Sequence, residues 1–367
     1  MKPRSETLVD PSTSVPSPRD IASVLEASVF GQRLAVREIA VALSKKLAGI
    51  ATGNVLLIGP SGSGKTTLMR AVESYLGSDP VLAKRSTVIR VHANILTQDA
   101  EAGAAGERLL HRLLARARDQ LGKDGPLETL LDRVAHGIVI LDEVDKIRAR
   151  IGDAPHTPGI QAQESLLTVM ENERLPLNLP AAVGGGQVFL DTRAILFVAA
   201  GAFEGLYDAV YDRVTVGQDR GSLQPVTVLD SAGVREETAF SLRQWLRSTD
   251  LFAYGISPQF LSRFDAVVLL EDLDESDLLK IFLGTPDSGY ESAKQFFARF
   301  GVELVLSPEA ARLIARKAAG QPRLGARALK EVFHRVIRDY EFAPADRAVD
   351  GALIIDVAEV EQALSRP

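Results

Sequence analysis

The stretch GPSGSGKT, Gly59 to Thr66, constrains the fold of this chain more than any other feature. It follows the apolar run NVLLI (54–58) and precedes a helical pattern. Glycines at these positions let backbone N–H groups turn inward around phosphate oxygens, and the following helix adds its positive end. Lys65 can reach the outer phosphates, and Thr66 can ligate Mg²⁺. The pattern therefore predicts a strand, a phosphate-binding loop and a helix in that order.

Helical patterns precede and separate a series of apolar runs. The first patterns cover 20–27 and 32–47. The runs that have the length of buried strands are 54–59, 86–93, 137–145, 194–201 and 265–273. Continuous apolar strands that alternate with helices indicate a parallel sheet covered on both faces. We therefore expect an α/β fold of the P-loop nucleotide-binding class.

The pattern changes to mostly helix after Leu273. In SPEAARLIARKAAG, Ser307 can cap a helix, Pro308 suits its first turn and Gly320 suits its end. The Pro-, Ser- and Thr-rich start of the chain is typical of disorder. The predicted organisation is a disordered tail, a large nucleotide-binding domain and a small, mainly helical domain, with ranges 1–18, 19–273 and 274–367.

A second motif, GIVILDEVDK, places Asp142 and Glu143 at the end of an apolar run. Ligands of α/β sheets bind at the carboxyl ends of strands. Asp142 would hold the Mg²⁺ shell and Glu143 would polarise an attacking water, which favours hydrolysis. Two arginines, Arg263 in FLSRF and Arg327 in GAR, are further candidates. Spacing alone cannot separate a catalytic arginine from a surface cation.

Composition restricts the class of protein. The chain of 367 residues is 46% hydrophobic and 25% charged, which is ordinary for a globular protein. Its net charge of −6 argues against nucleic acid as a partner. It has no cysteine, which excludes disulfides and thiolate metal sites. The start has no signal-peptide pattern, and no apolar run is long enough to span a bilayer. These features predict a soluble cytoplasmic protein with no membrane partner.

The ordered motifs together resemble the AAA+ unfoldases of the ClpX family and, more distantly, HslU. The resemblance runs from about Val15 to the end of the chain. The segments that carry it are VPSPRDIASVLEASVFGQ, GPSGSGKTT, GIVILDEVDKI, ILFVAAGAFEGL, FLSRF and LGARALK. The second and third look like the two Walker motifs, the fourth like the sensor 1 strand, and the last two like the arginine-finger and sensor 2 segments.

The resemblance implies a homo-hexamer that binds ATP and Mg²⁺ at its subunit interfaces. Glu143 would then be the catalytic acidic residue. Arg263 would reach the nucleotide of the neighbouring subunit, and Arg327 would touch the nucleotide of its own subunit. Thr66 and Asp142 would hold the Mg²⁺. The implied nucleotide-binding residues are Val29 and Phe30 over the adenine, then Gly59, Pro60, Ser61, Gly62, Ser63, Gly64, Lys65, Thr66, Thr67 and Asp142.

The segments that handle substrate depart from the family pattern. EAGAAGERL (101–109) aligns with the first pore loop, where the family has Tyr-Val and this chain has Ala104 and Ala105. Gly103 and Gly106 are expected to keep that loop flexible. Alanine offers little contact area to a polypeptide, whereas an aromatic ring offers much. We therefore expect a weak mechanical grip. The alternative is that another residue grips instead, and Ile160 in the second pore loop is the candidate.

Other departures concern partners. In the second pore loop (155–163), Pro155 replaces the expected arginine, and the channel-entrance loop PAAVGGGQ (180–187) has no basic residue. The Ile-Gly-Phe tripeptide that docks the ClpP peptidase is absent from 214–230, and the cysteine-based zinc domain has no counterpart. Sensor 1, which belongs to the ATPase part, ends in Ala199-Ala200-Gly201 without a polar side chain, and the ClpX family also lacks an obvious polar residue at this point. ClpP is therefore not an expected partner, and the identity of the protein client is left open.

Three functions fit these residues. The first is an ATPase that remodels a protein partner without ClpP. The second is an assembly module that ATP binding switches, without threading of a polypeptide. The third is a DNA-associated motor, which the acidic balance and the absence of a helix-turn-helix pattern disfavour. The basic run Lys146, Arg148 and Arg150 is best interpreted as a solvated loop.

Overall fold

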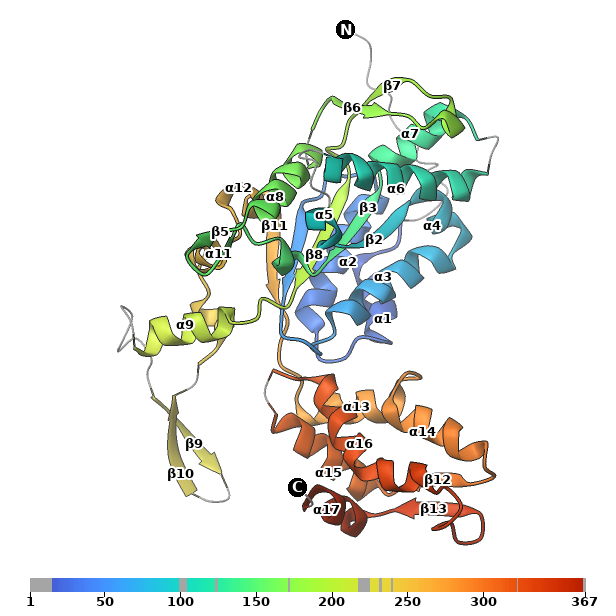
Figure 1. Cartoon of the computed structure of the whole chain (residues 1–367), viewed down its shortest axis with the longest axis vertical. Helices are drawn as coiled ribbons and strands as arrows, with labels where there is room; N and C mark the ends of the chain where they lie inside the picture. The colour runs from blue at the N-terminus through green and yellow to red at the C-terminus, as the bar shows by residue number, and fades with distance from the viewer. Residues whose placement is uncertain are drawn as a thin grey trace. The chain divides into compact units, whose positions relative to one another are not determined.

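The computed structural model describes residues 15–98, 104–122, 125–170, 172–216, 225–230, 233–238, 240–321 and 323–365 (Figure 1). Most of the predicted disordered tail, residues 1–14, lies outside these ranges. The chain divides into two compact units. The first, which we name the sheet unit, comprises 1–15, 42–58 and 76–269, and the second, the helical unit, comprises 16–41, 59–75 and 270–367. Helices α2 (Arg33–Leu47) and α3 (Lys65–Ser78) contribute residues to both units.

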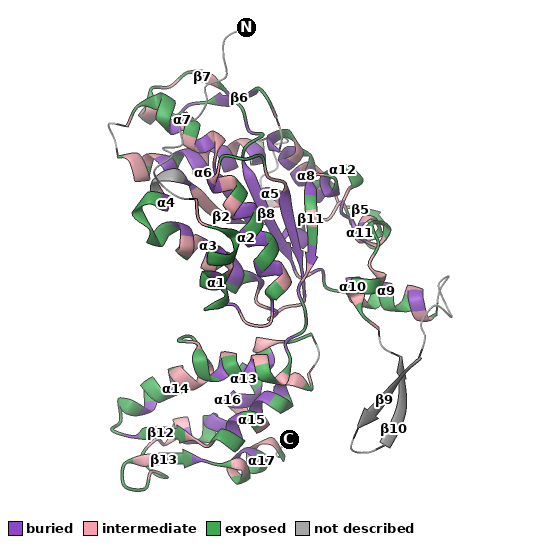
Figure 2. Cartoon of the chain, turned by 180° about the vertical axis from the view of Figure 1, so that it is seen from behind, coloured by how far each residue is buried: buried purple, intermediate pink, exposed green. Residues whose placement is uncertain are grey.

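A five-stranded sheet forms the centre of the sheet unit, in the order β11-β1-β8-β3-β2. Every neighbouring pair is parallel, which confirms the predicted α/β class. The three inner strands are buried along their whole length (Figure 2). This burial explains why they are continuous apolar runs instead of alternating ones. The strands are β1 (Asn54–Ile58), β2 (Val88–His92), β3 (Ile138–Asp142), β8 (Leu196–Gly201) and β11 (Phe264–Leu269).

Helices and three hairpins complete the sheet unit. Helix α6 packs against α7, α8 and β2, and α8 packs against η1, the short 3₁₀ turn after β3. The helices and turns are α4 (Pro80–Arg85), α5 (Ile95–Gln98), α6 (Ala104–Leu121), α7 (Leu127–Ala135), η1 (Val144–Ile147), α8 (Thr157–Val169), η2 (Ala181–Val183), α9 (Leu206–Thr215), α10 (Leu242–Trp245), α11 (Ser248–Tyr254) and α12 (Pro258–Leu261). The hairpins are β4–β5 (Arg150–Ile151, Ala154–Pro155), β6–β7 (Leu175–Asn178, Gln187–Leu190) and β9–β10 (Pro225–Asp230, Gly233–Thr238).

The helical unit has its own apolar core, formed mainly by residues between Leu273 and Val360. Ser307 caps α15 by accepting a 3.3 Å hydrogen bond from the backbone N–H of Ala310, as the sequence predicts. A short parallel pair, β12 with β13, lies beside the helices. The elements are α1 (Pro18–Glu26), α13 (Glu275–Gly284), α14 (Gly289–Ala298), β12 (Glu303–Leu306), α15 (Pro308–Ala319), α16 (Ala326–Phe342), β13 (Ala352–Ile355) and α17 (Val357–Ser365).

Two of the element ends that differ from the sequence expectation have a clear physical reason. Helix α1 starts at Pro18 instead of residue 20, because Ser17 and Asp20 form a reciprocal capping box. Strand β11 ends at Leu269 instead of 273, because Leu269 pairs with Ile58, the last residue of β1. Beyond that pair, the backbone N–H and C=O of Glu271 bond instead to the Gln32 side chain, at 3.0 and 2.8 Å.

Candidate ATP site and client-facing loops

The phosphate loop lies in the helical unit and contacts the start of α16. The backbone N–H of Ala326 donates to the Gly62 carbonyl at 3.1 Å. Gly62 has a φ of +81°, and a Cβ there would lie 2.2 Å from the Leu324 carbonyl oxygen. Only glycine fits this position, because both the backbone angle and the space exclude a side chain. Arg327, which is exposed, follows Ala326 directly, so the structure brings this predicted site residue next to the loop.

Lys65 begins α3, and its side chain is buried against the loop itself. Its ammonium donates to the carbonyls of Gly59 and Pro60, at 2.5 and 2.8 Å. The next two residues, Thr66 and Thr67, are exposed in the first turn of the helix. An ammonium and a helix N-terminus held against one glycine-rich turn form an anion-binding arrangement.

Gln32 is a residue of this site that the sequence reasoning did not assign. It is buried, and its amide Nε2 donates to the Ser63 carbonyl at 2.9 Å as well as to Glu271. It therefore fixes the phosphate loop to the segment that contains Val29 and Phe30. Val29 is buried and Phe30 is half-buried. The sequence signal that could have indicated this role is the position of Gln32 directly after the predicted adenine segment.

The acidic strand end lies in the sheet unit. Asp142 is the last residue of β3, is buried, and accepts a 3.0 Å hydrogen bond from the Glu143 backbone N–H. Glu143 has φ 58° and ψ 38°, a left-handed conformation that non-glycine residues rarely adopt. Such outliers concentrate at functional sites. The Glu143 carboxylate is 46% exposed and lies 3.9 Å from His92 Nδ1 at the end of β2.

Asp145 is a second polar residue that the sequence reasoning missed. It is buried in η1, and its Oδ1 accepts from the backbone N–H of Ala202 at 3.1 Å. Ala202 directly follows the predicted sensor 1 residues Ala199, Ala200 and Gly201, which are apolar and buried. Asp145 therefore ties the end of β8 to the segment after Glu143.

Arg263 lies at the amino-terminal end of β11, whereas Asp142 lies at the carboxyl end of β3 in the same sheet. Arg263 precedes Phe264, whose position in β11 is paired with Asn54 at the start of β1. The Asn54 amide is buried, donates to the Arg263 carbonyl at 2.8 Å and accepts from the backbone N–H of Phe197 at 2.9 Å. The strands are parallel, so Asp142, at a carboxyl end, is separated from Arg263 by the length of a strand. For β1 this length is about 13 Å.

These features together define the chain as a P-loop nucleoside triphosphatase. The phosphate loop follows β1 through the covalent bond between Ile58 and Gly59. Strands β1 and β3 both pair with β8, so their carboxyl ends lie at one edge of the sheet. This edge is where α/β sheets bind their ligands.

Comparison with known proteins identifies the family. The model of the AAA domain (Cdc48 subfamily) matches residues 50–267, which is more than half of the chain. The chain is 30% identical to the ATP-dependent Clp protease ATP-binding subunit ClpX 3 of Methylococcus capsulatus, over 98% of this chain and 83% of that protein. It is 28% identical to ClpX 2 of Wolinella succinogenes (89% and 78%) and to ClpX of Porphyromonas gingivalis (96% and 83%).

The chain therefore belongs to the AAA domain family and is a ClpX-like AAA+ ATPase that binds and hydrolyses ATP. Across the described ranges, no helix is both long and apolar enough to cross a membrane. Nor do the described residues contain a group of three or more acidic or histidine side chains that could hold a metal by itself. Mg²⁺ in nucleotide sites takes one or two protein oxygens plus phosphates, so it does not require such a group.

The segment expected to form the first pore loop, 101–109, lies only partly within the described residues. Residues 101–103 are outside them, and α6 begins at Ala104. The expectation that Gly106 keeps the loop flexible is wrong. Gly106 is buried inside α6, and its backbone N–H donates to Ser165 Oγ of α8 at 2.7 Å. A Cβ at this position would lie 2.4 Å from Val169 Cγ2, so the glycine permits close packing of two helices.

The segment expected to form the second pore loop, 155–163, starts at the last residue of the β4–β5 hairpin and continues into α8. Ile160, the candidate for a substitute grip, is half-buried within α8. Ile151 in the hairpin is instead 53% exposed. The sequence reasoning did not select Ile151. Arg148, from the basic run, stacks its guanidinium over the Tyr254 ring at 4.9 Å, so part of that run packs on the protein.

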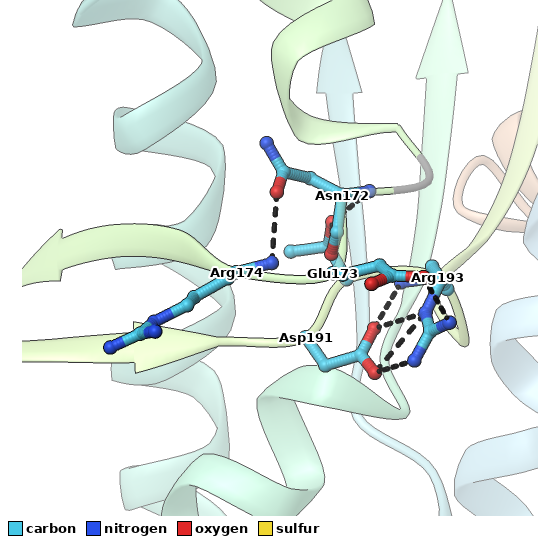
Figure 3. A network of polar contacts seen from close by, with 6 residues as sticks. Asn172, Glu173, Arg174, Asp191 and Arg193 are labelled. Carbon is cyan, nitrogen blue, oxygen red and sulfur yellow. Dashed lines mark hydrogen bonds and ion pairs between the residues drawn. The ribbon is translucent and has the colours of Figure 1, made fainter.

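The segment expected to form the channel-entrance loop connects β6 and β7, and polar contacts join the two chain segments at its base (Figure 3). Arg193 binds Asp191 through two nitrogens, at 3.0 and 2.6 Å, and Glu173 through a third, at 2.8 Å. The hydrogen bond from Arg193 lowers the pKa of Asp191 below its ordinary value. At the other end of β6, Asn178 donates to Glu107 Oε1 of α6 from both its backbone and its side chain, at 3.3 and 3.0 Å. The hairpin is thereby fixed to the helix that follows the first pore loop.

Proposed function

We propose that this protein uses ATP hydrolysis to remodel a protein client independently of ClpP. The single observation that carries the proposal is the contrast between two parts of the chain. The Walker, arginine-finger and sensor 2 segments each carry the residues that the family pattern requires. The segments beside the client-facing loops also pack against each other, as α6 does against α8. The side chains that grip substrate and dock ClpP in the family are replaced. The client class is protein because the relatives are named as subunits of a protease.

We assign the nucleotide site as follows. Lys65 and the loop from Gly59 to Gly64 bind the phosphates, with Thr66 and Thr67 in the first turn of α3. Val29 and Phe30 lie over the adenine. Thr66 and Asp142 offer a hydroxyl and a carboxylate, the hard oxygen ligands that suit Mg²⁺. The ion would neutralise charge on the phosphates. Glu143 orients and polarises the attacking water.

The two arginines act on different nucleotides in this proposal. Arg327 acts in its own subunit, which its position beside Gly62 supports. Arg263 acts on the nucleotide of the neighbouring subunit in a ring that we take to be a hexamer. Its place at the amino-terminal edge of the sheet supports this assignment, because the acidic strand end lies at the opposite edge.

The test is ATP-dependent unfolding of a fluorescent protein with a flexible tail, in a stable and a destabilised version. We expect loss of fluorescence from the destabilised version only, and none with Glu143→Gln. Ala104→Tyr should extend unfolding to the stable version, because an aromatic ring adds apolar contact at about 25 cal/mol per Å². Unfolding of the stable version by the unmodified protein contradicts the weak grip. Unfolding of neither version favours the nucleotide-switched assembly module.

A further inference from the structure

Gln163 lies in α8 and is one of the few buried polar residues of the sheet unit, at 2% exposure. Its amide Nε2 donates to the carbonyls of Ile147 and Gly255, at 2.7 and 2.9 Å. Its Oε1 accepts from the backbone N–H of Ser257 at 2.9 Å. Both donors and the acceptor of the amide are therefore used on backbone groups of two other segments.

The first of these segments leads from the acidic strand end. Ile147 is the last residue of η1, which begins directly after Glu143. The second segment leads to the predicted arginine finger. Ser257 caps α12, with its Oγ accepting from the Phe260 N–H at 3.2 Å, and the Arg263 N–H donates to the Phe260 carbonyl at 3.2 Å. The Gln163 amide thus connects the end of η1, which follows Glu143, with the start of α12, which precedes Arg263.

Helix α8 also connects this amide to the client-facing loops. It starts just after the β4–β5 hairpin. Ser165 on the same helix accepts a hydrogen bond from the Gly106 backbone N–H of α6. A shift of α8 therefore moves the Gln163 amide relative to both backbone segments. A buried amide with three backbone partners tolerates little displacement, because each lost bond leaves a buried polar group without a partner.

We propose that Gln163 is a positioning residue for ATP hydrolysis, which holds α12 so that Arg263 reaches the nucleotide of the neighbouring subunit. This inference rests on the proposed action of Arg263 in trans. The hydrogen bonds of the Gln163 amide go to backbone groups, so its effect on the reaction passes through the placement of Arg263. Its substitution should therefore impair the finger that a subunit supplies and leave the subunit's own nucleotide site working.

The first test is steady-state ATPase activity of Gln163→Met, which keeps the side-chain length and removes the hydrogen bonds. A misplacement of about 1 Å in a positioned catalytic group can cost on the order of 100-fold in rate. We expect a loss of about that size in kcat, with the KM for ATP changed less than about twofold, because finger contacts form mainly in the transition state. Gln244→Met, the same change at an exposed position of α10, is the control and should retain activity.

The decisive test mixes subunits. Glu143→Gln mixed with Arg263→Ala must first regain activity that neither has alone. If this mixture stays inactive, Arg263 does not act in trans, and the proposed role of Gln163 is rejected together with that assignment. If the mixture regains activity, Gln163→Met should regain activity with Glu143→Gln, which supplies an intact finger, and should remain inactive with Arg263→Ala.

Other patterns overturn the inference. Recovery with Arg263→Ala but not with Glu143→Gln would place the defect at the acidic strand end. Unchanged activity of Gln163→Met would show that the amide is dispensable. If Gln163→Met is insoluble, Gln163→Glu, which keeps the Oε1 acceptor for Ser257, takes its place in every mixture. If neither variant assembles with Glu143→Gln subunits, Gln163 is required for folding and the positioning role is rejected.

Discussion

At the residue scale, the two sides of the nucleotide site should give different failures. We expect Lys65→Ala to abolish ATP binding, because the Lys65 ammonium is held against the phosphate loop. Glu143→Gln should still bind ATP but hydrolyse it about 10² to 10⁴ times more slowly, because the proposed Mg²⁺ ligand Asp142 is intact and the proposed water activation is lost. Nucleotide binding by fluorescence and phosphate release measure the two effects. Glu164→Gln, an exposed position in α8, is the matched control. Hydrolysis by Glu143→Gln at the unmodified rate contradicts the assignment.

A half-buried lysine gives a second residue-scale prediction. Lys46 in α2 donates to the Ala194 carbonyl, and burial lowers its pKa to about 8, although Asp132 opposes the shift. Between about pH 8 and 10.5 the unfolded chain binds more protons at this side chain than the folded chain. The free energy of unfolding therefore rises with pH in that window.

The measurement is thermal unfolding from pH 7 to pH 10.5. Relative to Lys46→Met, the unmodified protein should gain stability as the pH rises, since methionine has no proton to release. Lys45→Met, at an exposed neighbouring position, controls for the loss of one charge. A stability difference between Lys46→Met and the unmodified protein that stays constant with pH would show that the shift is absent.

At the scale of elements, the contact between α6 and α8 is set by one missing side chain. Gly106→Ala would place a Cβ 2.4 Å from Val169 Cγ2 and 2.7 Å from the Ser165 carbonyl oxygen. We expect a loss of about 1–3 kcal/mol in the free energy of unfolding, because the helices must separate. Urea denaturation measures this loss.

Gly77→Ala in α3 is the control, since no atom outside its own helix lies within 4 Å of its Cβ position. It should gain up to about 1 kcal/mol from helix propensity. Equal effects at both positions would show that α6 and α8 are not tightly packed.

At the scale of the whole molecule, ATPase activity should depend on assembly. If Arg263 completes the site of a neighbour, dilution separates two parts of one catalytic centre. The activity per subunit should then fall on dilution together with the oligomer seen by sedimentation, by about 10³-fold or more for full loss of a finger. Arg263→Ala should show low activity at every concentration while it still assembles. Constant activity per subunit at concentrations where only monomers sediment would exclude the shared site.

The sequence by itself determined the parts of this protein whose chemistry is local. The turn from Gly59 to Thr66, the buried strands and the Asp142–Glu143 pair follow from residue types at fixed spacings along the chain. A strand buried on both faces must be apolar, and a phosphate loop needs glycines, whatever the distant residues are. The ordered motifs also led to the AAA+ family, which the comparisons confirm.

Only the tertiary structure decided which distant groups meet. Gln32 bonds to Glu271, 239 residues away, and Gln163 bonds to Ser257, 94 residues away. Asn54 reaches the Arg263 carbonyl because β11 lies beside β1, and Gly106 is packed because α8 lies against α6. A glutamine or glycine has the same local appearance whether it is exposed or buried. Its role is set by the order of the strands and the packing of the helices, which bring chain segments together at separations that no local pattern encodes.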